Sequence, residues 1–82
     1  MKIKFPNHFT ATLEGVSFLA KVDGQNFTCI VSTEALQDIN PSRAGDSREQ
    51  QYLDNRYNLE AIATKKIMGG DSSPIYIRTL DL

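Results

Sequence analysis

The alternation of hydrophobic and polar residues is clearest on either side of the dipeptide Asp23-Gly24. Asp-Gly between two such runs is typical of a two-residue β-hairpin turn, because both turn positions must tolerate positive φ. The predicted register has these pairs on the apolar face: Val16 with Val31, Phe18 with Cys29, Ala20 with Phe27, and Val22 with Gln25. A slip of one residue would turn one strand's apolar set to the wrong face, so the turn and the pattern support the same hairpin.

Shorter alternating runs predict three further strands. Residues 1–5 place Ile3 and Phe5 on one side and two lysines on the other, and lysines suit a sheet edge. Residues 9–13 predict a second short strand. Residues 75–82 alternate again and predict a closing strand.

Two helices are expected between the hairpin and the closing strand. The first begins at a cap formed by Ser32 or Thr33 and ends near Ile39, because the residue before Pro41 avoids the α region. The second, longer helix begins at Asp46 or Ser47 and ends near Met68, where Gly69-Gly70 stops it. Its predicted apolar stripe consists of Tyr52, Leu53, Leu59, Ala63 and Ile67, with Tyr57 and Met68 at the flank.

These elements predict a single α+β domain over residues 1–82. We expect a mainly antiparallel sheet, made of the N-terminal strand, the β-hairpin and the C-terminal strand, with one short and one long helix on one face. Because so short a chain covers one sheet face with helices, we expect an interaction surface on the opposite face of the hairpin, which bears Leu19 and Ile30. The alternative is a sheet edge, through self-association or addition of a partner strand.

Composition narrows the function classes. The 82 residues carry a net charge of −1, which disfavours broad nucleic-acid binding. No apolar run approaches the ~20 residues that span a bilayer, and no signal-peptide pattern is present, so we expect no membrane association. The single cysteine, Cys29, has no partner for an internal disulfide and suits the cytoplasm.

Arg56 and Glu60 are the most unusual pair, because both project within the apolar stripe of the long helix, one turn apart. One interpretation is a structural clamp that ties the helix to the sheet. Another is an anion- or partner-recognition site, with Arg56 as the binding fork and Glu60 orienting it. In a third, both side chains extend to water.

The other chemistry-bearing residues favour structural roles. Cys29 is expected in the core opposite Phe18, and catalysis by its thiol would require a base, for which only His8 is available. One Cys, one His and scattered acids predict no metal site, and no motif indicates a cofactor or catalytic residues. The basic residues Arg43, Arg48, Lys65, Lys66 and Arg78 are interleaved with acids and predict a mixed solvated surface.

Three stretches carry a family resemblance: residues 16–18, 29–36 and 56–63. Together they resemble the bacterial family called domain of unknown function 1488. The resemblance implies a stand-alone α+β protein of proteobacterial type with no assigned activity, whose members are sometimes labelled regulators from neighbouring shikimate-pathway genes. The family signature falls on Phe18, Cys29, Ser32, Leu36, Arg56, Glu60 and Ala63.

We therefore expect a small cytoplasmic, non-enzymatic binding or accessory protein that acts through an unidentified protein partner or through self-association as a homodimer. A DNA-associated transcriptional regulator linked to shikimate-pathway genes is the first alternative, and it requires a concentrated basic face. A small-ligand or anion binder that uses Arg56 and Glu60 is the second alternative.

Overall fold

The computed structural model describes all residues from Met1 to Leu82, and its centre is the hairpin of β3 (Gly15–Val22) and β4 (Gln25–Ser32). The register is the predicted one, with Phe18 opposite Cys29 and Ala20 opposite Phe27. Asp23 and Gly24 have φ of 50° and 85°, which confirms the two-residue turn. The local pattern therefore specified this part of the sheet correctly.

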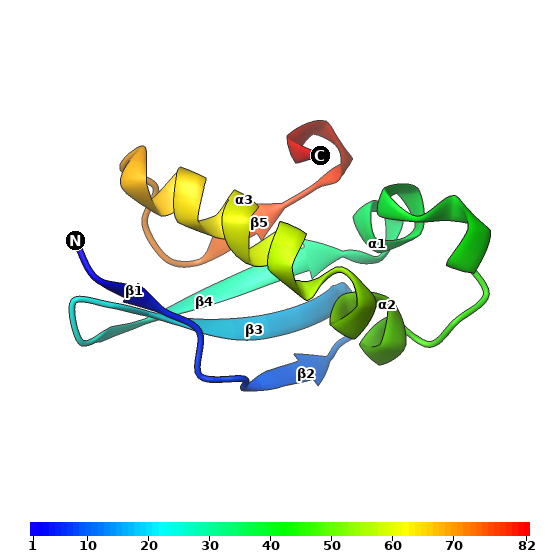
Figure 1. Cartoon of the computed structure of the whole chain (residues 1–82), viewed down its shortest axis with the longest axis horizontal. Helices are drawn as coiled ribbons and strands as arrows, with labels where there is room; N and C mark the ends of the chain where they lie inside the picture. The colour runs from blue at the N-terminus through cyan, green and yellow to red at the C-terminus, as the bar shows by residue number, and fades with distance from the viewer.

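Three short strands complete the sheet (Figure 1). β1 (Ile3–Lys4) and β2 (Phe9–Ala11) pair with successive parts of β3, and both run antiparallel to it. β5 (Ile75–Ile77) pairs with the far edge of β4. The sheet is thus mainly antiparallel, as predicted, and the strand order is β1-β3-β4-β5 with β2 beside β1 on the same edge of β3.

The closing strand is shorter than predicted, and the structure supplies its pairing, which the pattern did not predict. It ends at Ile77 instead of reaching Leu82, and its pairing with β4 is parallel. The backbone N–H of Arg78 donates to the Asp81 carboxylate at 2.8 Å, and this bond turns the chain into a short 3₁₀ helix, η2 (Thr79–Asp81). Leu80 consequently lies in solvent.

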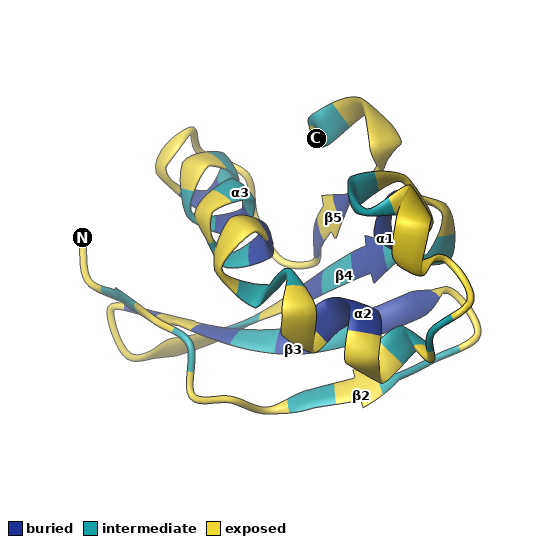
Figure 2. Cartoon of the chain, turned by 45° about the vertical axis from the view of Figure 1, so that its right-hand side comes forward, coloured by how far each residue is buried: buried dark blue, intermediate teal, exposed yellow.

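The helices α1 (Thr33–Ile39), α2 (Arg48–Asp54) and α3 (Arg56–Met68) all lie on the same side of the sheet (Figures 1 and 2). The Ser32 hydroxyl accepts the backbone N–H of Ala35 and caps α1, as predicted. A 3₁₀ turn, η1 (Pro41–Arg43), follows α1. Ser47 caps α2 in the same way as Ser32 caps α1, by accepting the N–H of Gln50.

The predicted long helix is two helices, because the α-helix breaks at Asn55. Its φ and ψ of −116° and 13° leave the helical region, and its side-chain amide donates to the Gln51 carbonyl at 2.8 Å. Asparagine favours such local bonds over helix continuation. The predicted stripe is correct for Tyr52, which is buried, and wrong for Leu53, which is 42 % exposed and does not belong to the core.

The core fills the space between the sheet and the three helices. It comprises 14 buried residues: Val16, Phe18, Ala20, Val22, Cys29, Val31, Ala35, Leu36, Tyr52, Leu59, Ala63, Ile67, Ile75 and Ile77. Gly15 permits the close approach of chain segments at one end of this core. A Cβ there would lie 1.9 Å from the Val31 carbonyl oxygen, so only glycine fits.

Candidate functional site

Arg56 begins α3, and it contacts the connection between β1 and β2. Its Nη1 donates to the side-chain oxygen of Asn7 at 2.8 Å. Asn7 has φ of 64°, a conformation that asparagine tolerates better than most residues, and this places it in the turn between the two strands. Arg56 thereby joins the helix layer to the sheet edge, which is the kind of contact that the clamp interpretation requires.

Glu60 is a weaker partner for Arg56 than the one-turn spacing suggests. The distance between Arg56 Nε and Glu60 Oε2 is 3.8 Å, and the two side chains are 26 % and 17 % exposed. Burial raises the pKa of Glu60, and the nearby guanidinium offsets this only in part. The pair therefore lies neither in a sealed interior nor fully in solvent.

Tyr57 occupies another side of the Arg56 guanidinium. Its hydroxyl accepts from Arg56 Nη2 at 3.4 Å, and the guanidinium carbon lies 5.2 Å from its ring centroid. The hydrogen bond to Tyr57 raises the pKa of Arg56, so the side chain remains charged. With donors directed to Asn7 and Tyr57, much of the fork that an anion would use already has a partner.

The other family-signature residues hold the fold. Phe18, Cys29, Leu36 and Ala63 are core residues, and Ser32 is the cap of α1. Burial raises the pKa of the Cys29 thiol to about 12, so it stays protonated and unreactive at neutral pH. His8 lies in the exposed loop between β1 and β2.

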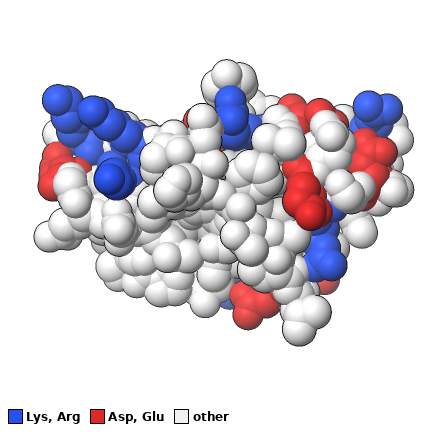
Figure 3. Space-filling view, turned by 90° about the horizontal axis from the view of Figure 1, so that it is seen from below, with Lys and Arg blue, Asp and Glu red and all other residues white.

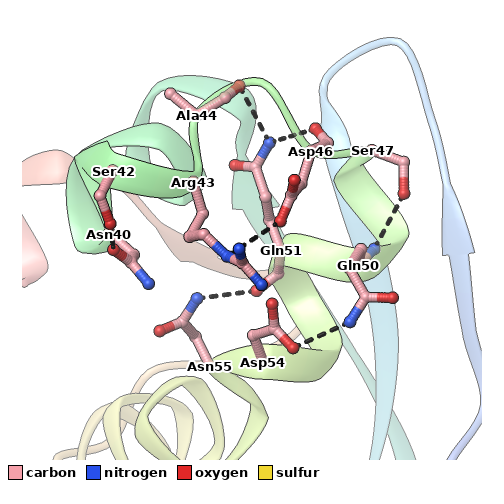
Figure 4. Close-up of polar contacts among 10 residues, drawn as sticks. All are labelled: Asn40, Ser42, Arg43, Ala44, Asp46, Ser47, Gln50, Gln51, Asp54 and Asn55. Carbon is pink, nitrogen blue, oxygen red and sulfur yellow. Dashed lines mark hydrogen bonds and ion pairs between the residues drawn. The ribbon is translucent and has the colours of Figure 1, made fainter.

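A polar network that the sequence did not predict organises the connection between α1 and α2 (Figure 4). Gln51 is 4 % exposed, and its amide nitrogen donates to the carbonyls of Asp46 at 2.6 Å and Ala44 at 3.4 Å. Arg43 and Asp46 form an ion pair at 3.3 Å in the same connection. Gln51 therefore stabilises the loop that leads into α2, although its Oε1 has no hydrogen-bond partner.

The sheet face opposite the helices is uncovered (Figure 2). Leu19 and Ile30 lie on it and are half-buried, as the alternation predicted. Tyr76 of β5 joins them, because the parallel register places it beside Ile30, and its side chain is 41 % exposed. Charged side chains border this face: the Arg78 guanidinium carbon lies 5.1 Å from the Tyr76 ring centroid, and Glu14 lines a hollow beside Ile30. We call this sheet face the outer face and define it by Leu19, Ile30 and Tyr76.

Two hollows mark the outer face. A hollow of about 520 Å³ extends from the β1–β2 loop at His8 to Leu19 and Thr28. A smaller one of about 280 Å³ lies between Ile30 and Tyr76. Hollows of this kind, lined by both apolar and polar side chains, are suited to receiving side chains of another molecule.

Basic residues gather at one end of the outer face, but they are not the ones that the sequence had singled out (Figure 3). Lys2, Lys4 and Lys21 line a hollow of about 420 Å³ near the hairpin turn. Sequence reasoning assigned the first two to a sheet edge and missed the third. The alternation of residues could have indicated this group. In the hairpin pattern Lys21 lies on the polar side, as Lys2 and Lys4 do in the pattern of residues 1–5.

The previously considered basic residues do not form one face. Arg43 pairs with Asp46, Lys66 pairs with Asp81 at 2.9 Å, and Arg48 donates to the Thr12 carbonyl. His, Cys, Asp and Glu side chains nowhere gather in groups of three or more that would hold a metal ion. The helices are all too short or too polar to cross a membrane.

Fold and signature residues together define a class of protein: a small α+β chain whose sheet is covered by helices on one face and open on the other. The chain belongs to DUF1488, a family of proteins of unknown function, whose model matches residues 3–77. This match confirms the resemblance carried by the hairpin, the α1 cap and the Arg56–Glu60 segment. Comparison with curated proteins and with solved structures gave no match.

Proposed function

We propose that this chain is a cytoplasmic, non-enzymatic binding module that contacts a protein partner through its outer face. The observation that supports this most is that no helix covers the sheet face of Leu19, Ile30 and Tyr76, which Glu14 and Arg78 border with charge. Half-buried aliphatic and aromatic side chains in such a patch are typical of the central part of a protein interface.

The sheet edges favour face contact over strand addition. β5 offers only three residues at one edge, and the opposite edge is divided between β1 and β2 by the loop at Asn7. Short and interrupted edge strands are poor templates for an added strand. The outer face is therefore the larger continuous surface for a partner.

The two alternatives have weaker support. A DNA-associated regulator requires a long basic surface, and Arg43, Arg48 and Lys66 have other partners. A small-ligand site at Arg56 and Glu60 requires free donors, and Arg56 already donates to Asn7 and Tyr57. A catalytic role for Cys29 conflicts with its complete burial.

Photo-crosslinking in the native cells tests the proposal. A photoreactive phenylalanine analogue replaces Leu19 on the outer face or, as control, Tyr57, which is 77 % exposed on the helix side. We expect one discrete adduct from position 19 that Ile30→Asp abolishes, and none from position 57. An adduct of twice the chain mass identifies the partner as a second copy. Absence of an adduct, or equal adducts from both positions, would contradict the proposal.

A further inference from the structure

Pairing of β1 with β3 brings the three lysines of the hairpin end together. Lys4 lies directly opposite Lys21 in the antiparallel register. Lys2 shares the side of Lys4, because alternate residues of an extended chain point the same way. Together with Asp23 and Gly24 they line the hollow of about 420 Å³, which we call the three-lysine pocket.

Positive charge in this pocket is balanced only in part, by one carboxylate against three lysines. The ion pairs of the structure are Arg43–Asp46, Arg56–Glu60 and Lys66–Asp81, so none of the three lysines belongs to one. The one acid that lines the pocket, Asp23, accepts the backbone N–H of Lys2 at 2.8 Å. Like charges directly opposite on antiparallel strands destabilise the pairing, so a bound anion would relieve a repulsion that the fold otherwise carries.

We propose that the three-lysine pocket binds a compact multivalent oxyanion of the di- or triphosphate class. Lysine ammonium groups bind phosphate as point charges, and three of them match a ligand with more than one negative charge. The volume falls within the range of small-molecule sites. The site shares no residue with the outer face, although Lys21 follows Leu19 on the same side of β3.

Nucleic acid is a poorer match for the same charges. A duplex presents phosphates along its whole length, and a protein that binds it needs a continuous basic path. Here the three lysines lie near the hairpin turn, and no continuous basic path crosses the face drawn in Figure 3. A short DNA duplex is therefore titrated alongside the oxyanion in the test of this site.

Calorimetric titration with pyrophosphate at constant ionic strength tests the site, with Lys21→Glu as the diagnostic variant. The introduced carboxylate would face Lys4 as an opposite-charge pair, so we expect the unliganded variant to melt at the wild-type temperature or higher. We expect its affinity for pyrophosphate to fall at least tenfold. Loss of binding then reports on the pocket and not on unfolding.

Lys65→Glu is the matched control, because it makes the same change of net charge at an exposed position of α3. Its affinity for pyrophosphate should stay within twofold of wild type. The proposal is overturned if wild type does not bind pyrophosphate at millimolar concentration, or if both variants lose affinity equally. Tighter binding of a short DNA duplex, abolished by Lys21→Glu, would replace it with a nucleic-acid site.

Discussion

At the scale of single residues, burial separates side chains that look equivalent in the sequence. Leu53 and Leu59 were both assigned to the apolar stripe of one helix, yet Leu59 is fully buried and Leu53 is 42 % exposed. At about 100° per residue, the two leucines project about 120° apart around a helix, so Leu53 lies at the border of the stripe. Hydrophobicity alone does not separate the two leucines, because a broad stripe admits leucine at its border as well as at its centre.

Alanine substitution measures this difference. We expect Leu59→Ala to lower the free energy of unfolding by about 2–5 kcal/mol, because it leaves a cavity in the core. Leu53→Ala should cost about 0.5 kcal/mol or less, as at other surface positions. Chemical denaturation with urea provides both values. Equal losses in the two variants would mean that Leu53 packs in the core as fully as Leu59 does.

At the scale of elements, local signals in the sequence were sufficient for the hairpin and the α1 cap. The turn residues lie directly between the alternating runs of β3 and β4, so the hairpin depends only on contacts that are close in sequence. The cap is local as well, because Ser32 accepts the backbone N–H of Ala35, three residues further on. The parallel pairing of β5 with β4 was not predicted, because Cys29 and Ile75 are far apart along the chain. The sequence pattern indicates which face of a strand is buried, but not which strand it pairs with or in which direction.

The candidate site shows the same division. The sequence correctly placed Arg56 and Glu60 one turn apart beside the apolar face. It could not show that Arg56 reaches Asn7, because that contact depends on how α3 lies over the β1–β2 loop. The gathering of Lys2, Lys4 and Lys21 likewise depends on the register of β1 against β3.

Arg56 and Glu60 differ in what they contribute to the contact between α3 and the sheet. We expect Arg56→Met to lower the melting temperature at pH 7, because the bond to Asn7 is lost. Glu60→Gln should leave it unchanged or raise it, because burial raises the pKa of Glu60 and the charged form is disfavoured in the fold. Differential scanning calorimetry distinguishes the two variants. A larger loss in Glu60→Gln would show instead that the ion pair is the main contact.

At the scale of the whole molecule, two carboxylates give the stability opposite dependences on pH. The backbone N–H of Arg78 and then Lys66 lower the pKa of Asp81, whereas burial raises the pKa of Glu60. A carboxyl group whose pKa is lower in the folded than in the unfolded protein adds stability at any pH above its unfolded pKa. This stability is lost as the pH falls through its folded pKa. The raised pKa of Glu60 has the opposite effect: stability increases as the pH falls, because protonation of Glu60 relieves the cost of its buried charge.

Asp81→Asn isolates one of these contributions. At pH 7 the variant should melt at a lower temperature than wild type, because it lacks the charged bonds to Lys66 and to the Arg78 backbone. The difference should shrink below about pH 4, the ordinary pKa of an aspartate, as Asp81 becomes protonated in wild type. Thermal melts from pH 7 to pH 2 measure it. A difference that stays constant over this range would exclude the charge of Asp81 as its cause.

The parallel placement of β5 beside β4 also sets an order of events during folding. Contacts within the hairpin close a very short loop, whereas the contact between Cys29 and Ile75 must wait for the intervening helices to assemble. Until then the Cys29–Val31 segment of β4 presents unpaired amide and carbonyl groups beside apolar side chains. The nascent chain is therefore most vulnerable to aggregation in the interval before its last strand arrives.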